Sequence, residues 1–422
     1  MSHQQWAVRH RLRVVLAALC LGALVACAPG DYSIGSRSFS FGAPQTPPPQ
    51  AIPNMQAQAG PIPNTIAPGA IAVGQSFGQG PVRVALLLPL SGDPALSGVG
   101  SSLANASRLA VSYIESNSNI ADNITVILKD TGTSPGGAAQ AASEAVAEGA
   151  SIILGPLKAD QVTAAGGVAR SAGIPLIGFS NNASAAGPGV YLLSVLPENE
   201  VRRSLTLVQA QGRTKFAAVF PNTDYGRVQE RAFGEIAAAL GISPAAIYHF
   251  GNETEARGIV TQLGPQISAG QVDALFLPDR GTAPSFATML EQTGVARPAL
   301  TIIGSADWEG DPAILATPFL GGAVYPAVDP AGYNAIVADY QRQFGGNPHP
   351  LATIAYTATI LANVSALSMS NPKYDRETLT APSGFNGRDG VFRFNPNGRA
   401  DYALVVKQVA PGGAQLVDGP RM

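Results

Sequence analysis

The chain has 422 residues, of which 46% are apolar and 13% charged, and its formal net charge is −2. This composition excludes a wholly disordered protein, and the lack of a basic excess argues against nucleic acid as a partner. After the N-terminal segment no run of about 18 apolar residues occurs, so we expect no membrane span in the mature chain.

The N-terminal segment is typical of an export signal. Three arginines within residues 9–13 form a basic region, and an apolar run over residues 14–26 follows them. The tetrapeptide Leu24-Val25-Ala26-Cys27 resembles the lipobox of bacterial lipoproteins. This resemblance implies a signal peptide of residues 1–26, lipidation of the Cys27 thiol and a mature chain of residues 27–422. An ordinary secretory signal that contains a cysteine is the alternative.

Cysteine usage and the next fifty residues agree with a tethered periplasmic protein. The other cysteine, Cys20, lies in the segment that would be removed, so no disulfide is available. Two or more acyl chains anchor a protein stably. Ala28 stands where an aspartate would indicate inner-membrane retention in enteric bacteria, which favours the outer membrane. Residues 27–80 are rich in Pro, Gly and Gln, and we expect a disordered linker there.

After Gly80 strand and helix patterns alternate. The run Val82–Leu88 is apolar on both faces apart from Arg83, which predicts a buried strand of a parallel sheet. A helix to about residue 115 and a strand at residues 124–128 complete a βαβ unit, and open α/β sheets bind ligands beyond the first strand of such a unit. The unit continues with helices near residues 137–148 and 160–171 and strands at residues 151–154 and 175–178, and a segment at residues 191–195 leads into the next helix.

A second unit of the same kind follows. It comprises helices near residues 198–211, 227–240, 256–267 and 284–293, and strands at residues 216–220, 246–250, 272–277 and 299–303. Two such units predict an α/β protein with two lobes, each a doubly wound parallel sheet flanked by helices, and a cleft between them. Helices near residues 333–344 and 352–368 come next, and two strands around an Asn397-Gly398 turn finish the pattern, at residues 391–394 and 402–409.

Over residues 82–409 the chain resembles the type I periplasmic binding fold, in particular its leucine/isoleucine/valine-binding branch. The resemblance rests on segments in the family's order, among them ALLLPLSG at residues 85–92, Asp224-Tyr225-Gly226 and Phe385-Asn386-Gly387. It implies that the chain crosses between the lobes near residues 195–199, 326–330 and 382–386. Lobe 1 would then hold residues 81–198 and 328–384, lobe 2 residues 199–327 and 385–410, and residues 411–422 would be a tail.

Within that superfamily the chain resembles the domain of penicillin-binding protein activators more closely. The similar features are Gly155-Pro156-Leu157-Lys158 after a strand, Leu196-Pro197-Glu198-Asn199-Glu200 before a helix, and the lipid anchor with its spacer. This resemblance implies a peptidoglycan synthase as the partner. The N-terminal helical repeat domain of the enteric activators is absent from this sequence, so the partner surface stays open.

Candidate ligand-binding residues lie in the loops that follow the strands. They are Ser91, Gly92, Leu157, Lys158, Ser180, Asn181, Asn182, Tyr225, Asp279, Arg280, Asp307 and Trp308. A free amino acid needs hydroxyls and backbone N–H groups for its carboxylate and an acidic residue for its ammonium. In amino-acid-binding relatives a serine-rich loop holds the carboxylate. Here the corresponding loop reads Lys158-Ala159-Asp160, so this carboxylate site is incomplete.

Several lobe 1 candidates also have a structural interpretation. Ser180 and Asn182 can bind a polar ligand, but residues 180–184 are equally typical of a polar turn. Lys158 can face an anion, although a solvated lysine near a helix start is the commoner outcome.

The lobe 2 candidates are open in the same way. Asp307 is a candidate for an ammonium, and Asp279 and Arg280 can pair with each other. Trp308 can stack on a ligand or fill an empty cleft as a lid.

Enzyme motifs are missing from the sequence. The two histidines of the mature chain, His249 and His349, are far apart, and no HExxH, GxSxG, P-loop or paired Cys/His ligand set occurs. We therefore expect no catalysis, no cofactor and no metal. Two hypotheses remain: a penicillin-binding protein activator that regulates peptidoglycan synthesis, and a solute-binding lipoprotein that delivers amino acids or a related small polar ligand to an ABC transporter permease. A hydrolase is a remote third.

Overall fold

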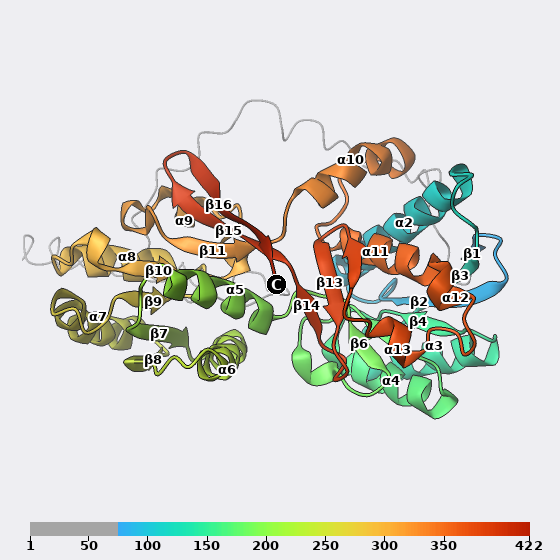
Figure 1. Cartoon of the computed structure of the whole chain (residues 1–422), viewed down its shortest axis with the longest axis horizontal. Coiled ribbons are helices and arrows are strands. Elements are labelled where there is room, and N and C mark those ends of the chain that lie inside the picture. The colour runs from blue at the N-terminus through green and yellow to red at the C-terminus, as the bar shows by residue number, and fades with distance from the viewer. Residues whose placement is uncertain (1–74) are drawn as a thin grey trace, which may run out of the picture. The chain divides into compact units, whose positions relative to one another are not determined.

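The structure, a computed structural model, describes residues 75–422. The predicted signal peptide, the lipidation site Cys27 and the linker up to residue 74 lie outside the described residues. The elements group into two lobes, each built on one large sheet, and the predicted two-lobed α/β fold is confirmed (Figure 1).

Lobe 1 is built on a six-stranded sheet in the order β1-β3-β2-β4-β5-β6. The predicted strand Val82–Leu88 is β2, and it lies parallel to both of its neighbours because its side chains are apolar on both faces. β1 was not predicted; it pairs antiparallel with β3 and makes the sheet mixed. The strands are β1 (Ser76–Phe77), β2 (Val82–Leu88), β3 (Ile124–Asp130), β4 (Ile152–Leu154), β5 (Leu176–Gly178) and β6 (Val190–Leu192).

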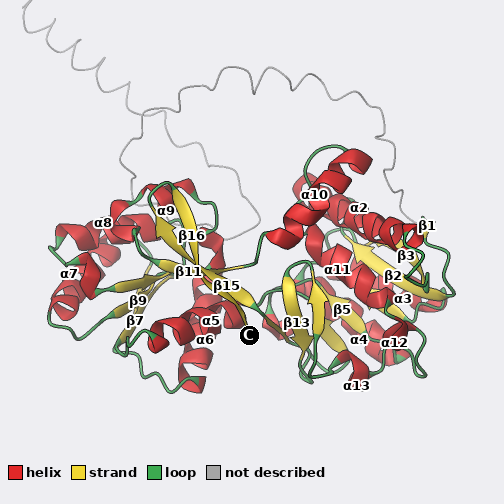
Figure 2. Ribbon diagram, turned by 45° about the horizontal axis from the view of Figure 1, so that its top comes forward, coloured by secondary structure: helices red, strands yellow, loops and turns green. Residues whose placement is uncertain are grey.

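Helices cover both faces of this sheet (Figure 2). On one face α3 (Pro135–Ala147) and α4 (Ala159–Ala172) pack through small alanine side chains, which let a helix approach a sheet closely. On the other face α2 (Pro94–Ser116) and α11 (Ala352–Asn363) bury larger side chains. Almost every residue of α11 is buried, and α10 (Ala331–Phe344) packs against α2 and α11.

Lobe 2 repeats this plan with a seven-stranded sheet in the order β16-β15-β11-β10-β9-β7-β8. Strands β7 to β11 are parallel, and β15 and β16 extend the sheet as an antiparallel edge. Helices α5 and α6 cover one face, and α7, α8 and α9 the other. The strands are β7 (Phe216–Pro221), β8 (Ala246–Phe250), β9 (Ala274–Phe276), β10 (Thr301–Ile303), β11 (Val324–Ala327), β15 (Leu404–Ala410) and β16 (Gly413–Arg421); the helices are α5 (Pro197–Ala210), α6 (Asp224–Ala239), α7 (Glu253–Ser268), α8 (Ala283–Gln292) and α9 (Pro312–Ala316).

The C-terminal hundred residues depart most from the prediction. Residues 385–402 form a small sheet of β12 (Phe385–Gly387), β13 (Gly390–Phe394) and β14 (Ala400–Tyr402), and this sheet packs in the core of lobe 1 rather than lobe 2. The aromatic side chains decide this placement: the Phe394 ring centre lies 5.3 Å from that of Tyr191 on β6. The third crossing therefore follows β14 at Ala403, not residues 382–386.

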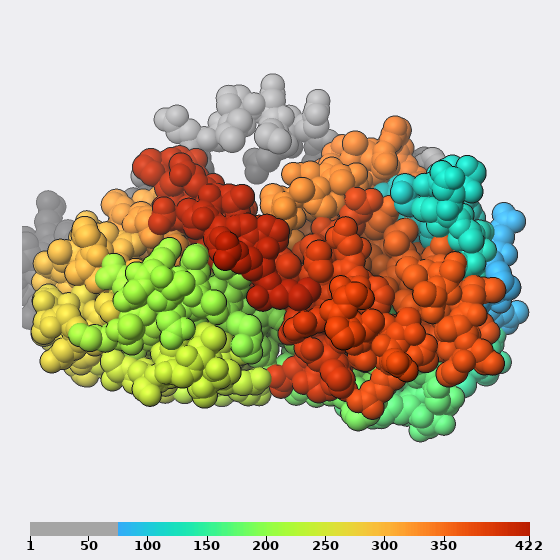
Figure 3. All heavy atoms as spheres, viewed as in Figure 1, coloured from blue at the N-terminus to red at the C-terminus, as the bar shows by residue number. Residues whose placement is uncertain are grey.

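The predicted tail is a strand, and one predicted helix is broken. Residues 413–421 form β16, which pairs with β15 and lies on the surface over lobe 2 in dark red (Figure 3). The helix predicted at residues 352–368 stops before Val364, whose backbone is extended, and continues as the short α12 (Ser365–Ser368), followed by α13 (Arg376–Leu379).

Both lobes place their parallel strands in the same order, β3-β2-β4-β5-β6 and β8-β7-β9-β10-β11. In each sheet the order reverses next to the first strand, between β2 and β4 and between β7 and β9. Ligands of open α/β sheets bind beyond the carboxyl ends of the strands at such a switch point. We therefore expect a ligand-binding site at the carboxyl ends of the strands at these two switch points. Among residues 75–422 no helix combines the length and the apolar character that crossing a membrane requires.

Candidate functional site

On lobe 1 the turn after β2 is held by a carboxylate at the end of β3. The backbone N–H groups of Leu90 and Gly132 each donate to Asp130 Oδ1 at 2.8 Å. Burial acts to raise the pKa of Asp130, but hydrogen bonds from Ser91, Gly132 and Leu90 outweigh it and hold the pKa below its usual value. Gly92 has φ +90°, and a Cβ there would lie 2.8 Å from Thr133 Cγ2. Ser91 and Gly92 are therefore fixed at the switch point of lobe 1.

The loop after β4 carries the other two predicted residues of this switch point. Leu157 packs half-buried against the lobe 1 core. Lys158 Nζ lies 3.5 Å from Asp160 Oδ2, and both side chains are partly exposed. Lys158 thus pairs with Asp160 of its own turn, and this favours a solvated lysine over one that faces an anion in the cleft.

The loop after β5 is largely self-contained. Ser180 is buried, and its Oγ accepts from the Asn182 backbone N–H at 3.2 Å. Asn182 Oδ1 accepts from the backbone N–H of Ser184 at 3.1 Å and from its hydroxyl at 2.8 Å. These bonds favour the polar-turn interpretation, and Asn181 and Ser184 are the exposed residues of the turn.

On lobe 2 the predicted Tyr225 joins the ends of two strands. Its hydroxyl lies 2.9 Å from Ser305 Oγ, after β10, and 3.2 Å from the carbonyl oxygen of Pro278, after β9. Ser305 Oγ donates to the same carbonyl at 2.7 Å. Burial and the charge of Asp307 raise the pKa of Tyr225, so the hydroxyl stays neutral.

A residue that is not among the predicted ligand-binding residues completes this face. Glu200, in the first turn of α5, accepts a hydrogen bond on Oε2 from the Ala306 backbone N–H at 3.1 Å. Burial raises the pKa of Glu200 to about 8, and the charges of Asp307 and Glu198 add to the increase against the opposing Ala306 N–H. The raised pKa favours the protonated form of the half-buried Glu200 carboxyl at neutral pH.

Asp279 and Asp307 bring further acidic groups to the same edge. Asp279 is buried and accepts from Thr282 Oγ1 at 2.6 Å, and its burial, with a contribution from Asp307, raises its pKa. Asp307 is exposed. Within residues 75–422 no cationic side chain forms an ion pair with Glu200, Asp279 or Asp307. This face is suited to a positively charged group from outside the protein.

The structure excludes two of the interpretations that the sequence left open for lobe 2 side chains. Trp308 is fully buried in the lobe 2 core, and its ring centre lies 6.2 Å from that of Tyr325. Its indole also packs on Gly304, so the side chain is part of the core and cannot stack on a ligand or cover a cleft. Arg280 is exposed and forms no ion pair with Asp279.

Metal-binding groups and cavities among the described residues were the other candidates for a site. None of residues 75–422 forms a group of three or more His, Cys, Asp or Glu side chains able to hold a metal. Three cavities of about 310, 570 and 520 Å³ are lined by residues other than the twelve predicted ones.

Sequence reasoning missed Asp130, Glu200 and Ser305. Asp130 and Ser305 come at or just after the carboxyl ends of predicted strands, so the same rule that selected Ser91 points to them. Glu200 lies on a helix and carries no such signal. Only the fold brings it to Ala306.

Comparisons with known proteins agree with this architecture. The family profile described as "Periplasmic binding protein" matches residues 81–414. A putative branched-chain amino acid ABC transporter protein from Rhodospirillum rubrum superposes with a TM-score of 0.66 at 20% identity, covering 80% of this chain and 99% of that one. An ABC transporter substrate-binding protein from Desulfitobacterium hafniense, in complex with Leu, has a TM-score of 0.57 at 18% identity and the same coverage.

A third solved structure extends this list. It is the leucine-, isoleucine-, valine-, threonine- and alanine-binding protein from Brucella ovis, with a TM-score of 0.57 at 15% identity, covering 82% of this chain and 95% of that one. A search of curated protein sequences found no match. At these identities the likeness to solved structures shows the fold.

Proposed function

The chain belongs to the periplasmic binding protein family, and we propose that it is a solute-binding protein that closes its lobes on a small polar solute bearing an ammonium group and delivers it to an ABC transporter permease. Amino acids are the first ligands to test. The protein acts by binding, without catalysis and without a cofactor.

The observation that carries this proposal is Glu200. A carboxyl kept protonated by burial and by acidic neighbours ionises when an ammonium arrives, since an opposite charge favours the anionic form. Asp307 lies close enough to raise the pKa of Glu200 and adds a second negative charge. Tyr225 and Ser305 border the same edge and supply hydroxyls for further polar contacts.

The solute-binding hypothesis is better supported than the activator hypothesis. Two of the similar solved structures are named as ABC transporter proteins, one of them for branched-chain amino acids, and the third is named as a binding protein for leucine and four other amino acids. None of the similar structures named above is a penicillin-binding protein activator. The missing serine-rich loop at Lys158-Ala159-Asp160 remains a difference from amino-acid-binding relatives, so the ammonium end of the solute is the part that these residues explain.

Isothermal titration of the purified protein tests the proposal. Leucine, isoleucine and valine are compared with their N-acetyl derivatives, which lack the ammonium, in buffers of different ionisation enthalpy. We expect an amino acid to bind at pH 7 with release of about one proton, because Glu200 has a pKa of about 8 in the free protein. The N-acetyl derivatives should bind at least tenfold more weakly.

Glu200→Gln and a matched variant identify the carboxyl. The glutamine variant should lose the proton release and bind about ten- to hundredfold more weakly, as expected for removal of a charge-assisted hydrogen bond. Glu291→Gln removes an exposed carboxylate of the same lobe and should change neither quantity. Binding that is equally tight in wild type and Glu200→Gln would contradict the proposed role.

We also propose that the mature protein is held in the periplasm by lipid on Cys27, on the outer membrane. The lipobox and the residue that follows it support this location. Cys27→Ser should move the protein from the membrane fraction to the soluble periplasmic fraction, and density separation of the two membranes should place the wild type with the outer one. Recovery of wild type and variant in the same fraction would contradict the anchor.

A further inference from the structure

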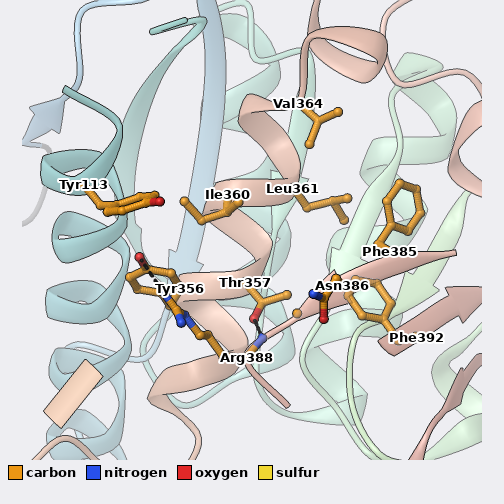
Figure 4. A pocket seen from close by; sticks show the side chains of 11 residues that line it. Tyr113, Tyr356, Thr357, Ile360, Leu361, Val364, Phe385, Asn386, Arg388 and Phe392 are labelled. Carbon is orange, nitrogen blue, oxygen red and sulfur yellow. Dashed lines mark hydrogen bonds between the residues drawn. The ribbon is translucent and has the colours of Figure 1, made fainter. Parts of the chain in front are cut away.

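A cavity of about 310 Å³ lies within lobe 1, between α11 and the β12–β13 hairpin, with Tyr113 of α2 at its rim (Figure 4). Its lining residues are different from those at the carboxyl ends of the strands, so it is separate from the proposed solute site. Ligand pockets span about 300 to 1,000 Å³, and this cavity has the size of a small-molecule site at the lower limit.

The walls of this cavity are mostly apolar. Ile360 and Leu361 of α11 form one side, and the rings of Phe385 and Phe392 form the other (Figure 4). At the rim, Tyr113 and Val364 leave 45% and 38% of their surfaces exposed. A hydrocarbon or aryl group entering the cavity would cover these surfaces and gain free energy from their removal from water.

One end of the cavity carries an arginine without an acidic partner. The Arg388 guanidinium carbon lies 4.8 Å from the Tyr356 ring centre, and Nη2 donates to the Tyr356 hydroxyl at 3.2 Å. The Arg388 backbone N–H donates to Thr357 Oγ1 at 2.9 Å, and this bond holds the β12–β13 turn against α11. In the part of the chain that the structure describes, no carboxylate comes within 4.0 Å of this guanidinium.

The neighbouring arginine shows the contrast. Arg342 lines the adjacent cavity, which shares Tyr113, Tyr356 and Arg388 with the first, but its charge is paired with Asp339. Arg388 is therefore the cation that this surface offers to a ligand. Its planar fork of donors matches a carboxylate, and stacking on Tyr356 already orders the guanidinium, so less side-chain entropy is lost on binding.

We propose that this cavity is a second binding site of the protein, for a small apolar monocarboxylate. The carboxylate binds the Arg388 guanidinium, and the hydrocarbon or aryl part lies between Leu361 and the rings of Phe385 and Phe392. One unpaired arginine selects a single negative charge, and the volume limits the ligand to a small molecule.

The test compares 4-phenylbutyrate with its neutral amide, by titration of the full-length protein followed by calorimetry and by protein NMR. The acid should bind about ten- to hundredfold more tightly than the amide, as expected for a hydrogen bond to a charged group. This comparison requires no variant, so it shows whether the protein recognises the carboxylate even where a substitution lowers stability. Equal binding of acid and amide, or no binding of the acid at millimolar concentration, would overturn the proposal.

Variants then locate the ligand. Arg388→Gln should reduce the affinity for the acid to that for the amide and leave the amide unchanged, whereas the matched Arg342→Gln should change neither. Glu200→Gln should also have no effect, because it lies in the proposed solute site. Loss of phenylbutyrate binding in Glu200→Gln but not in Arg388→Gln would assign the ligand to the solute site and overturn the second one. The solute titrations are unaffected by either outcome, so the two proposals fail independently.

Discussion

The effect of Glu200→Gln on the free energy of unfolding can be predicted from the pKa of Glu200. Folding raises the pKa of this carboxyl from 4.5 to about 8. The folded state therefore holds the proton more tightly than the unfolded state, and the free energy of unfolding of the wild type falls as pH rises through this interval. From pH 4.5 to pH 7 the loss is about 3 kcal/mol, at about 1.4 kcal/mol per pH unit.

Glutamine avoids this loss. Its side chain does not ionise, and its amide oxygen can still accept from the Ala306 N–H that now binds Glu200 Oε2 at 3.1 Å. The variant should equal the wild type near pH 4 and exceed it by about 3 kcal/mol at pH 7. Glu291→Gln, at an exposed position, should follow the wild-type curve within about 0.5 kcal/mol.

Urea unfolding at a series of pH values measures the difference. Trp308 is buried in the lobe 2 core, so its fluorescence reports unfolding of the lobe that contains Glu200. Parallel curves for Glu200→Gln and wild type from pH 4 to pH 7 would refute the reasoning, as would a variant that is the less stable of the two at pH 7. Either result would mean that the carboxyl is ionised in the folded protein.

Two further predictions concern lobe 2. Arg203 is buried, and its Nε donates to the Leu404 carbonyl at 2.7 Å and its Nη2 to Asp418 at 2.6 Å, so Arg203→Met should lower the free energy of unfolding by about 3 kcal/mol. Arg202→Met, at an exposed position, should change it by no more than about 0.5 kcal/mol, and equal urea midpoints for the two variants would contradict the prediction. A Cβ on Gly304 would lie 2.2 Å from the Trp308 ring, so Gly304→Ala should lower the free energy of unfolding by about 1 to 3 kcal/mol and shift the Trp308 fluorescence emission. Gly258 lies in open space on α7, so Gly258→Ala should raise the free energy of unfolding by up to about 1 kcal/mol. An unchanged emission spectrum in Gly304→Ala would be the contrary result.

Local patterns sufficed for most of the framework. Val82–Leu88 reads as a strand buried on both faces because every residue but Arg83 is apolar, and it became the central strand β2. The alternation of such strands with helices predicted two doubly wound lobes, and both sheets have that order. The rule that ligands meet the carboxyl ends of strands placed Ser91, Tyr225 and Asp279 at the two switch points.

The same patterns misplaced residues whose partners are distant in sequence. Alternating apolar residues predict a strand at Val391–Phe394, but they do not say which sheet or core it joins. Phe394 meets Tyr191 from some two hundred residues earlier, and this contact puts the small sheet in lobe 1. Trp308 looked like a ligand contact because it follows a strand, yet its indole fills the space beside Gly304 in the core.

By itself the sequence determined most of the parallel strands, most of the helices that flank them and the two-lobed α/β class, because these follow from the spacing of apolar and turn-forming residues along the chain. The export signal stays a prediction. Only the tertiary structure decided that Glu200 meets Ala306, that Arg388 lies on Tyr356 without an acidic partner, and that residues 413–421 complete the sheet of lobe 2. Each of these depends on burial and on charges brought together from distant parts of the chain, and neither can be read from local spacing.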